Sequence, residues 1–100
     1  MMDIDAKEML QRIRDKEPFN LLDVREQIEF YTWNVGGINI PLLKLENKLN
    51  ELEWNKNDEI IVVCRAGLRS QTAKSILELN GYKNIRNLSG GLLALQKIQS

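Results

Sequence analysis

Short apolar runs recur along the chain and are bounded by charged or turn-forming residues. Each run is three to seven residues long, the length of a typical β-strand. The run at residues 60–63 consists only of isoleucine and valine, a composition typical of a strand that is covered on both faces. The pattern therefore predicts a buried strand there and three further strands at residues 19–25, 38–40 and 85–88.

Between these runs, apolar residues recur at helical spacing. Residues 5–16 show this pattern and begin with Asp5, a residue suited to the N-cap of a helix. Leucines recur every three or four positions over residues 42–52, with lysine and glutamate between them, which predicts an amphipathic helix. The remaining helices are expected over residues 26–33, 70–80 and 92–98.

The alternation of strands and helices predicts the fold class. It favours a parallel sheet, because parallel strands need a crossover connection that is usually helical. We therefore expect a three-layer α/β/α domain with a central, mainly parallel sheet of about five strands. One hundred residues, 43% of them hydrophobic, suit one domain that spans residues 1–100 without a linker or repeat.

The composition limits the partners of the chain. Fourteen basic residues balance fourteen acidic ones, so no overall electrostatic field favours nucleic acid or an anionic membrane. No apolar stretch reaches the length of a membrane-spanning helix, and the amino terminus lacks the apolar core of a signal peptide. We expect a cytoplasmic protein that binds neither nucleic acid nor membranes.

The chain contains a single cysteine, Cys64, and no histidine. An internal disulfide is therefore excluded, and a closed zinc site lacks its usual soft ligands, so we expect no metal. Hydrolases that use histidine as a general base are excluded, and so is phosphotransfer through histidine. A nucleophile in this chain must be activated in another way.

Cys64 follows the buried strand and opens the loop Cys64-Arg65-Ala66-Gly67-Leu68-Arg69-Ser70. The carboxyl ends of parallel strands are where α/β sheets bind ligands. If the loop wraps around the sulfur, its backbone amides converge on one point, with Gly67 supplying conformations that other residues disfavour. These amides, the next helix N-terminus and the arginines would lower the pKa of the thiol. Arg65 and Arg69 could also bind an oxyanion. The alternative is an inert, buried cysteine beside two solvent-facing arginines.

Asp23 and Arg25 end the predicted strand at residues 19–25. This end of a strand lies at the functional edge of such a sheet. Charged residues there often mark only the transition to solvent. Sequence position alone leaves both interpretations open.

The loop from Cys64 to Ser70 resembles the active-site loop of the rhodanese-type sulfurtransferases. Three further segments match signatures of this family, in the same order and across nearly the whole chain. Leu22-Asp23-Val24-Arg25-Glu26 resembles the first-strand signature, Gly37-Ile38-Asn39-Ile40-Pro41 the second, and Asn87-Leu88-Ser89-Gly90-Gly91 the glycine turn before the last helix. The chain is similar to single-domain, thiosulfate sulfurtransferase-like members of the family.

The resemblance implies a rhodanese-like fold and thiosulfate:cyanide sulfurtransferase-type activity. Cys64 would take a sulfane sulfur from thiosulfate or a related donor and hold it as a persulfide. The acceptor would be a thiol, cyanide or a sulfur-relay protein. The amides from Arg65 to Ser70 would cradle the persulfide, and the side chains of Arg65 and Arg69 would bind the donor anion. Asp23 and Arg25 would brace the loop, and no cofactor is implied.

Two positions depart from the family pattern. Asn34 stands where many members have a histidine, and Leu95 stands where an aromatic residue is common. Neither is the nucleophile. We expect altered packing near the site with the chemistry intact.

Two other functions stay open. A non-catalytic rhodanese-like module would bind or regulate a partner, although such modules commonly lose the cysteine or the basic residues of the loop. A cysteine phosphatase or arsenate reductase would place its arginine after five intervening residues, where this chain has Ser70. Arg69 follows Cys64 after only four intervening residues, and the smaller loop suits one sulfur atom better than a phosphate.

Overall fold

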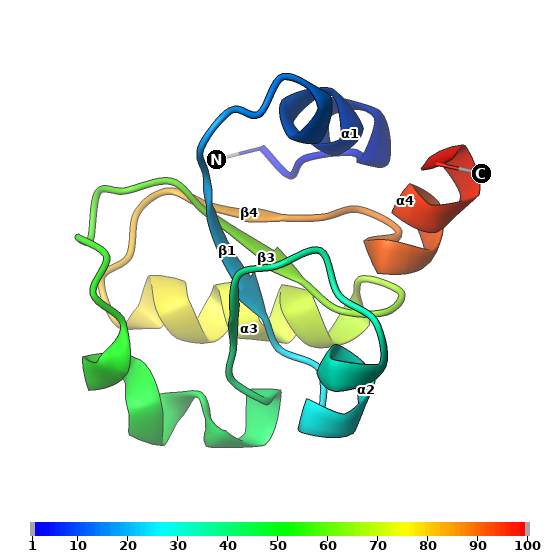
Figure 1. Cartoon of the computed structure of the whole chain (residues 1–100). Coiled ribbons are helices and arrows are strands. Elements are labelled where there is room, and N and C mark those ends of the chain that lie inside the picture. The colour runs from blue at the N-terminus through cyan, green and yellow to red at the C-terminus, as the bar shows by residue number, and fades with distance from the viewer. Residues whose placement is uncertain (1, 100) are drawn as a thin grey trace.

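The computed structural model describes residues 2–99 and has three layers (Figure 1). All strands of its sheet are parallel, and they lie in the order β2-β1-β3-β4. The strands are β1 (Asn20–Asp23), β2 (Ile38–Asn39), β3 (Ile60–Val63) and β4 (Ile85–Asn87). The predicted α/β class and parallel sheet are confirmed.

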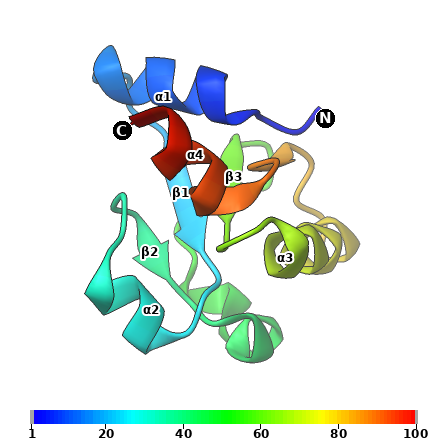
Figure 2. The same cartoon turned by 90° about the vertical axis from the view of Figure 1, so that its right-hand side faces the viewer.

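Helices cover both faces of this sheet (Figures 1 and 2). On one face lie α1 (Ala6–Arg14) and α4 (Gly91–Gln99), and on the other lies α3 (Leu68–Leu79). The short helix α2 (Gln27–Thr32) follows β1 and buries none of its residues. The predicted N-cap of α1 is confirmed, because Asp5 Oδ1 accepts a hydrogen bond from Glu8 N at 2.7 Å.

Strand β3 is buried along its whole length. Ile60 and Val62 pack on the α3 side, whereas Ile61 and Val63 pack on the side of α1 and α4. All four side chains have no exposed surface, because successive residues of a strand point to opposite faces and both faces are covered. Cys64 comes next and returns to the α3 side.

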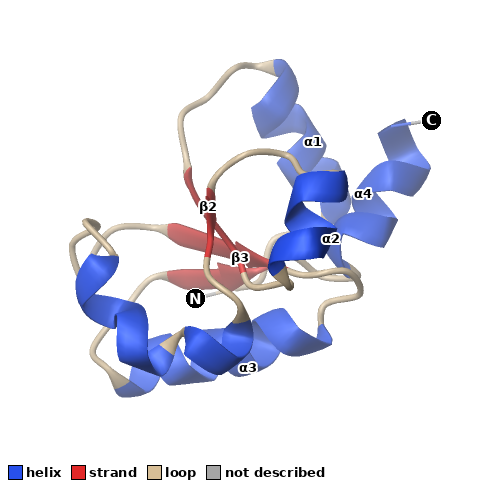
Figure 3. Cartoon of the chain, turned by 60° about the horizontal axis from the view of Figure 1, so that its bottom comes forward, coloured by secondary structure: helices blue, strands red, loops and turns tan. Residues whose placement is uncertain are grey.

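The leucine repeat over residues 42–52 does not form the predicted α-helix. It forms two 3₁₀ helices, η1 (Leu42–Lys44) and η2 (Glu46–Glu51), drawn as helix in Figure 3. Their hydrogen bonds span three residues, as from Leu45 N to Leu42 O at 3.1 Å. Within the repeat, leucines three positions apart suit a helix with three residues per turn. The apolar spacing could not separate this form from an α-helix with 3.6 residues per turn.

Within residues 2–99 the sheet has four strands rather than about five. A fifth segment is reduced to an isolated parallel bridge between Ile4 and Leu88. Ile4 N donates to Asn87 O at 3.0 Å, and Ser89 N donates to Ile4 O at 2.9 Å. The next residue, Asp5, is already the N-cap of α1, so the pairing ends after one residue.

Charged side chains link α1 to the amino-terminal edge of the sheet. Arg12 on α1 bonds to Glu59, the residue before β3. Arg86 on β4 contacts the same carboxylate at 3.2 Å and Glu8 of α1 at 2.9 Å. We call these four residues the amino-edge cluster. Hydrogen bonds from the guanidinium groups hold the pKa values of Glu8 and Glu59 below their ordinary value.

Candidate active site

The sulfur of Cys64 is enclosed by the loop that follows β3. The side chain is 1% exposed. Its Sγ accepts hydrogen bonds from Gly67 N at 3.1 Å and Ser70 N at 3.3 Å, and Ser70 Oγ lies 3.2 Å away. Ser70 is in the first turn of α3, so its amide is one of the donors that a helix N-terminus leaves unpaired. Two loop amides thus converge on the sulfur, as a cradle requires.

Gly67 begins the turn into α3 with a left-handed backbone, at φ 97°. Glycine adopts this conformation without the steric cost that a side chain would add. The helix starts directly after it, at Leu68, two residues before the predicted start at Ser70. This earlier start brings the Ser70 amide into the first turn of the helix, next to Sγ.

The first turn of α4 holds the outer side of the loop. Leu92 N donates to Cys64 O at 2.9 Å, and Leu93 N donates to Arg65 O at 3.0 Å. In a trans peptide the carbonyl and the amide of the same peptide bond point in opposite directions. The amides of Arg65 and Ala66, which share peptide bonds with these two carbonyls, therefore point away from α4. The contact requires a glycine at Gly91, because a Cβ there would lie 2.3 Å from Arg65 O.

The surroundings of Cys64 act on its pKa in opposite directions. Burial of the thiol raises the pKa, because it disfavours the charged form. The Ser70 hydroxyl and the amides of Ser70, Gly67 and Ala66 lower it by hydrogen bonding to the sulfur, and together they prevail. The pKa of Cys64 therefore lies below its ordinary value without a histidine base.

Asn87 links the Ser70 hydroxyl to the cysteine loop. No role was assigned to Asn87 from the sequence alone. Asn87 Oδ1 lies within hydrogen-bond distance of Ser70 Oγ, whose single proton is donated either to this oxygen or to the ionised sulfur of Cys64. Asn87 Nδ2 donates to Gly67 O at 3.3 Å and to Gln71 Oε1 at 2.9 Å. Asn87 is only 5% exposed, and an amide side chain in a short core strand needs such partners. The presence of this polar side chain within a predicted strand was the sequence signal that could have identified Asn87.

Of the two loop arginines, Arg69 has a side-chain partner among the described residues and Arg65 has none. Arg69 forms a two-pronged ion pair with Glu29 of α2, with Nη1–Oε1 at 2.6 Å and Nη2–Oε2 at 3.0 Å. This pairing lowers the pKa of Glu29 to about 2. Among residues 2–99, Arg65 has no hydrogen-bond or ion-pair partner for its side chain, and it lines a pocket beside the loop.

Asp23 and Arg25 pair with each other. Arg25 Nη2 donates to Asp23 Oδ2 at 2.8 Å and to the carbonyl of Trp33 at 2.7 Å. Asp23 has no exposed surface, and Arg25 is 6% exposed. The hydrogen bonds of these two side chains thus hold the end of α2, where Trp33 lies, and none within residues 2–99 reaches the cysteine loop directly.

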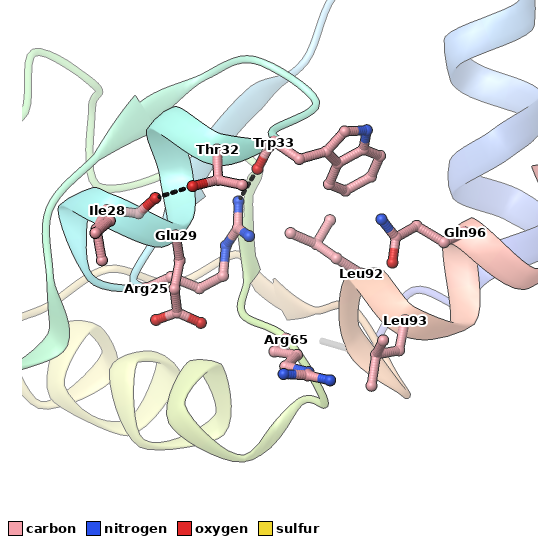
Figure 4. A pocket seen from close by; sticks show the side chains of 9 residues that line it. All are labelled: Arg25, Ile28, Glu29, Thr32, Trp33, Arg65, Leu92, Leu93 and Gln96. Atoms are coloured by element: carbon pink, nitrogen blue, oxygen red, sulfur yellow. Dashed lines mark hydrogen bonds between the residues drawn. The ribbon is translucent and has the colours of Figure 1, made fainter.

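A pocket of about 340 Å³ opens beside the cysteine loop (Figure 4). One wall comes from α2 and the residue after it, and the other comes from α4. Its lining residues are Arg25, Ile28, Glu29, Thr32, Trp33, Arg65, Leu92, Leu93 and Gln96. Apolar side chains stand on both walls, while Arg65 and Glu29 bring charge to the end near α3.

Asn34 and Leu95, the two departures from the resemblance, have structural partners away from the sulfur. Asn34 Nδ2 donates to Phe30 O at 2.9 Å, and its Oδ1 accepts from Gly36 N at 2.8 Å. It thereby closes the end of α2 and the turn that leads to β2. Leu95 has no exposed surface and packs in the core between the sheet and α1.

The described residues contain no group of three metal-ligating side chains. None of the helices within residues 2–99 is long and apolar enough to cross a membrane.

Comparison with known proteins identifies the family. The family model for the rhodanese-like domain, which describes the sequences of that family, matches residues 5–98 of this chain. The chain belongs to this family. The resemblance seen in the sequence and the expected rhodanese-like fold are thereby confirmed.

Relatives of this rhodanese-like domain include named sulfur-transfer proteins. YrkF of Bacillus subtilis, whose name proposes a sulfur-carrier role, is 35% identical over 91 residues, which are 90% of this chain and 48% of YrkF. This chain thus spans about half the length of YrkF. The thiosulfate sulfurtransferase PspE of Escherichia coli is 37% identical over 81 residues, covering 78% of this chain and 77% of PspE. The crystal structure of a rhodanese-like domain protein from Staphylococcus aureus matches with a TM-score of 0.82 at 29% identity, covering 95% of this chain and 91% of that chain.

Proposed function

We propose that this rhodanese-like domain is a sulfurtransferase that carries a sulfane sulfur as a persulfide on Cys64. The observation behind the proposal is the convergence of the Gly67 and Ser70 amides and the Ser70 hydroxyl on Sγ, all within 3.3 Å. These donors stabilise negative charge on the sulfur, and the thiolate is the nucleophilic form of cysteine. The persulfide that forms is also an anion beside the same donors.

The reaction has two steps. In the first, the Cys64 thiolate attacks the outer sulfur of thiosulfate or a related donor. An S–S bond forms at Sγ, the bond between the two donor sulfurs breaks, and its electron pair leaves with sulfite. In the second, cyanide or a thiolate attacks the terminal sulfur of the persulfide, and the electron pair of the broken S–S bond returns to Sγ. Neither step needs an external oxidant or reductant.

We assign separate roles to the groups around the sulfur. Arg65 binds the donor anion, because its guanidinium lines the pocket and has no partner among residues 2–99. Arg69 stands close enough for the charges of Arg69 and Cys64 to favour one another, so we assign it the support of the thiolate, while its two terminal nitrogens stay bonded to Glu29. The backbone from Arg65 to Ser70 cradles the persulfide, and the Asp23–Arg25 pair keeps Trp33 in the pocket wall.

The acceptor in this proposal is a thiol or cyanide, and a protein thiol in a sulfur relay fits the same chemistry. The sulfur-carrier name of YrkF supports a relay role. We place the reaction in the cytoplasm, because a reducing compartment keeps a single thiol free.

Mass spectrometry of the intact protein after incubation with thiosulfate tests the proposal. We expect the gain of one sulfur atom on Cys64, its removal by cyanide with formation of thiocyanate, and no gain in the Cys64→Ser variant. A folded protein that stays unmodified with every sulfane donor offered would indicate the non-catalytic binding module instead.

The position of Ser70 supports the sulfurtransferase proposal over a cysteine phosphatase. Ser70 occupies the position where those enzymes need their arginine, and its buried side chain contacts Sγ and Asn87. No guanidinium can therefore stand at that position of the loop. Turnover of a phosphate ester without sulfur loading would reverse this conclusion.

A further inference from the structure

The two arginines of the cysteine loop differ in how they are available to a substrate. Both terminal nitrogens of Arg69 bond to the carboxylate of Glu29, at 2.6 and 3.0 Å. Arg65 lines the pocket and has no side-chain partner among the described residues. A donor anion in the pocket therefore meets one free guanidinium rather than two.

Glu29 is held in place by α2 as well as by Arg69. Its Oε1 accepts a hydrogen bond from Glu26 N at 3.1 Å, as part of a capping box at the start of α2. The hydrogen bond from Arg69 lowers the pKa of Glu29 to about 2, so the carboxylate is ionised throughout the physiological range. Glu29 also lines the pocket, where its charge disfavours a second negative charge on a ligand.

The remaining charges of the pocket are balanced. Arg25 also lines it, but its guanidinium is paired with the buried carboxylate of Asp23. The pocket therefore offers one uncompensated positive charge, from Arg65. Its other lining includes apolar side chains on both walls, namely Ile28, Trp33, Leu92 and Leu93.

We propose that Glu29 is a specificity-determining residue that withdraws Arg69 from donor binding and so favours singly charged sulfane donors with an apolar substituent over doubly charged thiosulfate. This inference rests on the proposed sulfurtransferase function. A thiosulfonate fits the description, because it carries one negative charge and a carbon substituent. The Cys64 thiolate attacks its outer sulfur, an S–S bond forms at Sγ, and the electron pair of the broken bond leaves with the sulfinate.

The substitution Glu29→Gln isolates the effect. A glutamine can keep its Oε1 bonded to Arg69 Nη1 and Glu26 N, while its amide nitrogen can no longer accept from Arg69 Nη2. The Glu29 side chain is 29% exposed, so the exchange needs no repacking of the core. It removes one negative charge from the pocket and frees part of the Arg69 guanidinium.

Steady-state kinetics with thiosulfate and with benzenethiosulfonate as donors give the test. In Glu29→Gln we expect the KM for thiosulfate to fall about fivefold and that for benzenethiosulfonate to change by less than about twofold. Comparing each donor with itself in the two proteins cancels their different intrinsic reactivities. The matched control is Glu53→Gln, which removes an exposed acid from the connection between η2 and β3 and should change neither KM.

A double variant, Glu29→Gln with Arg69→Gln, separates a freed arginine from a general charge effect. Its net charge equals that of the unchanged protein, and Arg65 is again the one loop arginine. We expect the thiosulfate KM to return to within about twofold of the starting value. A double variant that keeps the full gain shows that Arg69 does not bind the donor and overturns the proposal.

Sulfur loading of Cys64 distinguishes a failure of the proposed sulfurtransferase function from a failure of the proposed role of Glu29. If neither donor loads sulfur onto any variant, the sulfurtransferase proposal itself fails. If both donors load sulfur but Glu29→Gln leaves the ratio of the two KM values unchanged, only the role of Glu29 is wrong. Thermal unfolding of each variant confirms that the kinetic differences are measured on folded protein.

Discussion

Charged residues have different roles at the two ends of the parallel strands. We call the side of the sheet where the strands begin the amino edge and the side where they finish the carboxyl edge. At the amino edge, the arginines and glutamates of the amino-edge cluster are equal in number and contact one another. At the carboxyl edge, Arg25 pairs with Asp23 and Arg69 pairs with Glu29, while Arg65 has no side-chain partner within residues 2–99. The second edge therefore keeps one positive charge available to a ligand.

The hydrogen bonds at the two edges also differ in kind. At the amino edge, part-buried side chains bind side chains, and ion pairs so close to solvent contribute modestly to stability. At the carboxyl edge, loop amides bond to a sulfur atom and loop carbonyls bond to the amides of α4. Charge is balanced where it only connects elements, and it is left unbalanced beside the cysteine loop, where the proposed function calls for a thiolate and an anionic donor.

Gly91→Ala should produce the largest effect, at the carboxyl edge. The added Cβ would lie 2.3 Å from Arg65 O and force the loop away from α4. We expect a loss of about 3 kcal/mol in the free energy of unfolding, because backbone must move, together with loss of sulfur loading. Denaturant unfolding and mass spectrometry measure the two quantities.

Gly36→Ala is the matched control for this prediction. Gly36 has a similar left-handed backbone at φ 97°, but a Cβ there meets nothing within 4 Å. The cost should be about 1 kcal/mol from conformation alone, with sulfur loading retained. Equal losses in the two variants would show that close contact with α4 is unimportant.

Arg65→Gln should have the next largest effect. Removing the unpaired guanidinium should raise the KM for an anionic donor about tenfold and leave the free energy of unfolding within about 0.5 kcal/mol. Arg12→Gln, at the amino edge, is the comparison and should leave the KM unchanged. The KM for the donor is measured on both variants. A larger change of KM in Arg12→Gln than in Arg65→Gln would contradict the contrast between the two edges.

Ser70→Ala should have a smaller effect, on reactivity. Loss of the hydroxyl removes one hydrogen bond to the sulfur and therefore raises the pKa of Cys64. Alkylation of Cys64 by iodoacetamide at pH 7 should slow by roughly threefold to tenfold, with the midpoint of its pH profile moved upward. Thr72→Ala, at an exposed position of α3, is the control and should leave the profile in place. An unchanged profile in Ser70→Ala would assign the activation to the backbone amides alone.

Arg86→Gln should have the smallest effect, confined to stability. We expect a loss of about 1 kcal/mol or less at pH 7 and unchanged sulfur loading. The pKa values of Glu8 and Glu59 are held below 4.5 in the folded chain. Their contribution is therefore present above pH 4.5 and lost as pH falls through the folded values.

Denaturant unfolding of both proteins at pH 7 and pH 3 checks this sign. The difference in unfolding free energy between the unchanged chain and Arg86→Gln should shrink at the lower pH. A difference that grows on acidification would show that the cluster does not stabilise the ionised carboxylates.

The parts of the fold that local pattern determines were predictable. The β-branched run gave β3 with its observed bounds, because a strand covered on both faces needs apolar residues at every position. The leucine repeat was misassigned, because its spacing fits both an α-helix and two 3₁₀ turns. The choice depends on how this connection packs against the sheet, and residues 42–52 do not encode that packing by themselves.

The site was predictable to the same extent. The cysteine loop and its amides are contiguous in sequence, so the cradle could be expected. Glu29 and Arg69 are 40 positions apart, and nothing local indicated their pairing. Asn87 reaches the loop because β4 pairs with β3 in a register that sets it beside Val62. Such partners follow from how strands and helices meet, which the sequence pattern does not specify.

The contact between α4 and the cysteine loop also sets the order in which the site can be completed during synthesis. Cys64 and its loop leave the ribosome before Leu92 and Leu93, which anchor the carbonyls of Cys64 and Arg65. A nascent chain, or one cut before Leu92, lacks these two hydrogen bonds to the loop. We therefore expect its thiol to keep the reactivity of an ordinary cysteine until α4 has formed.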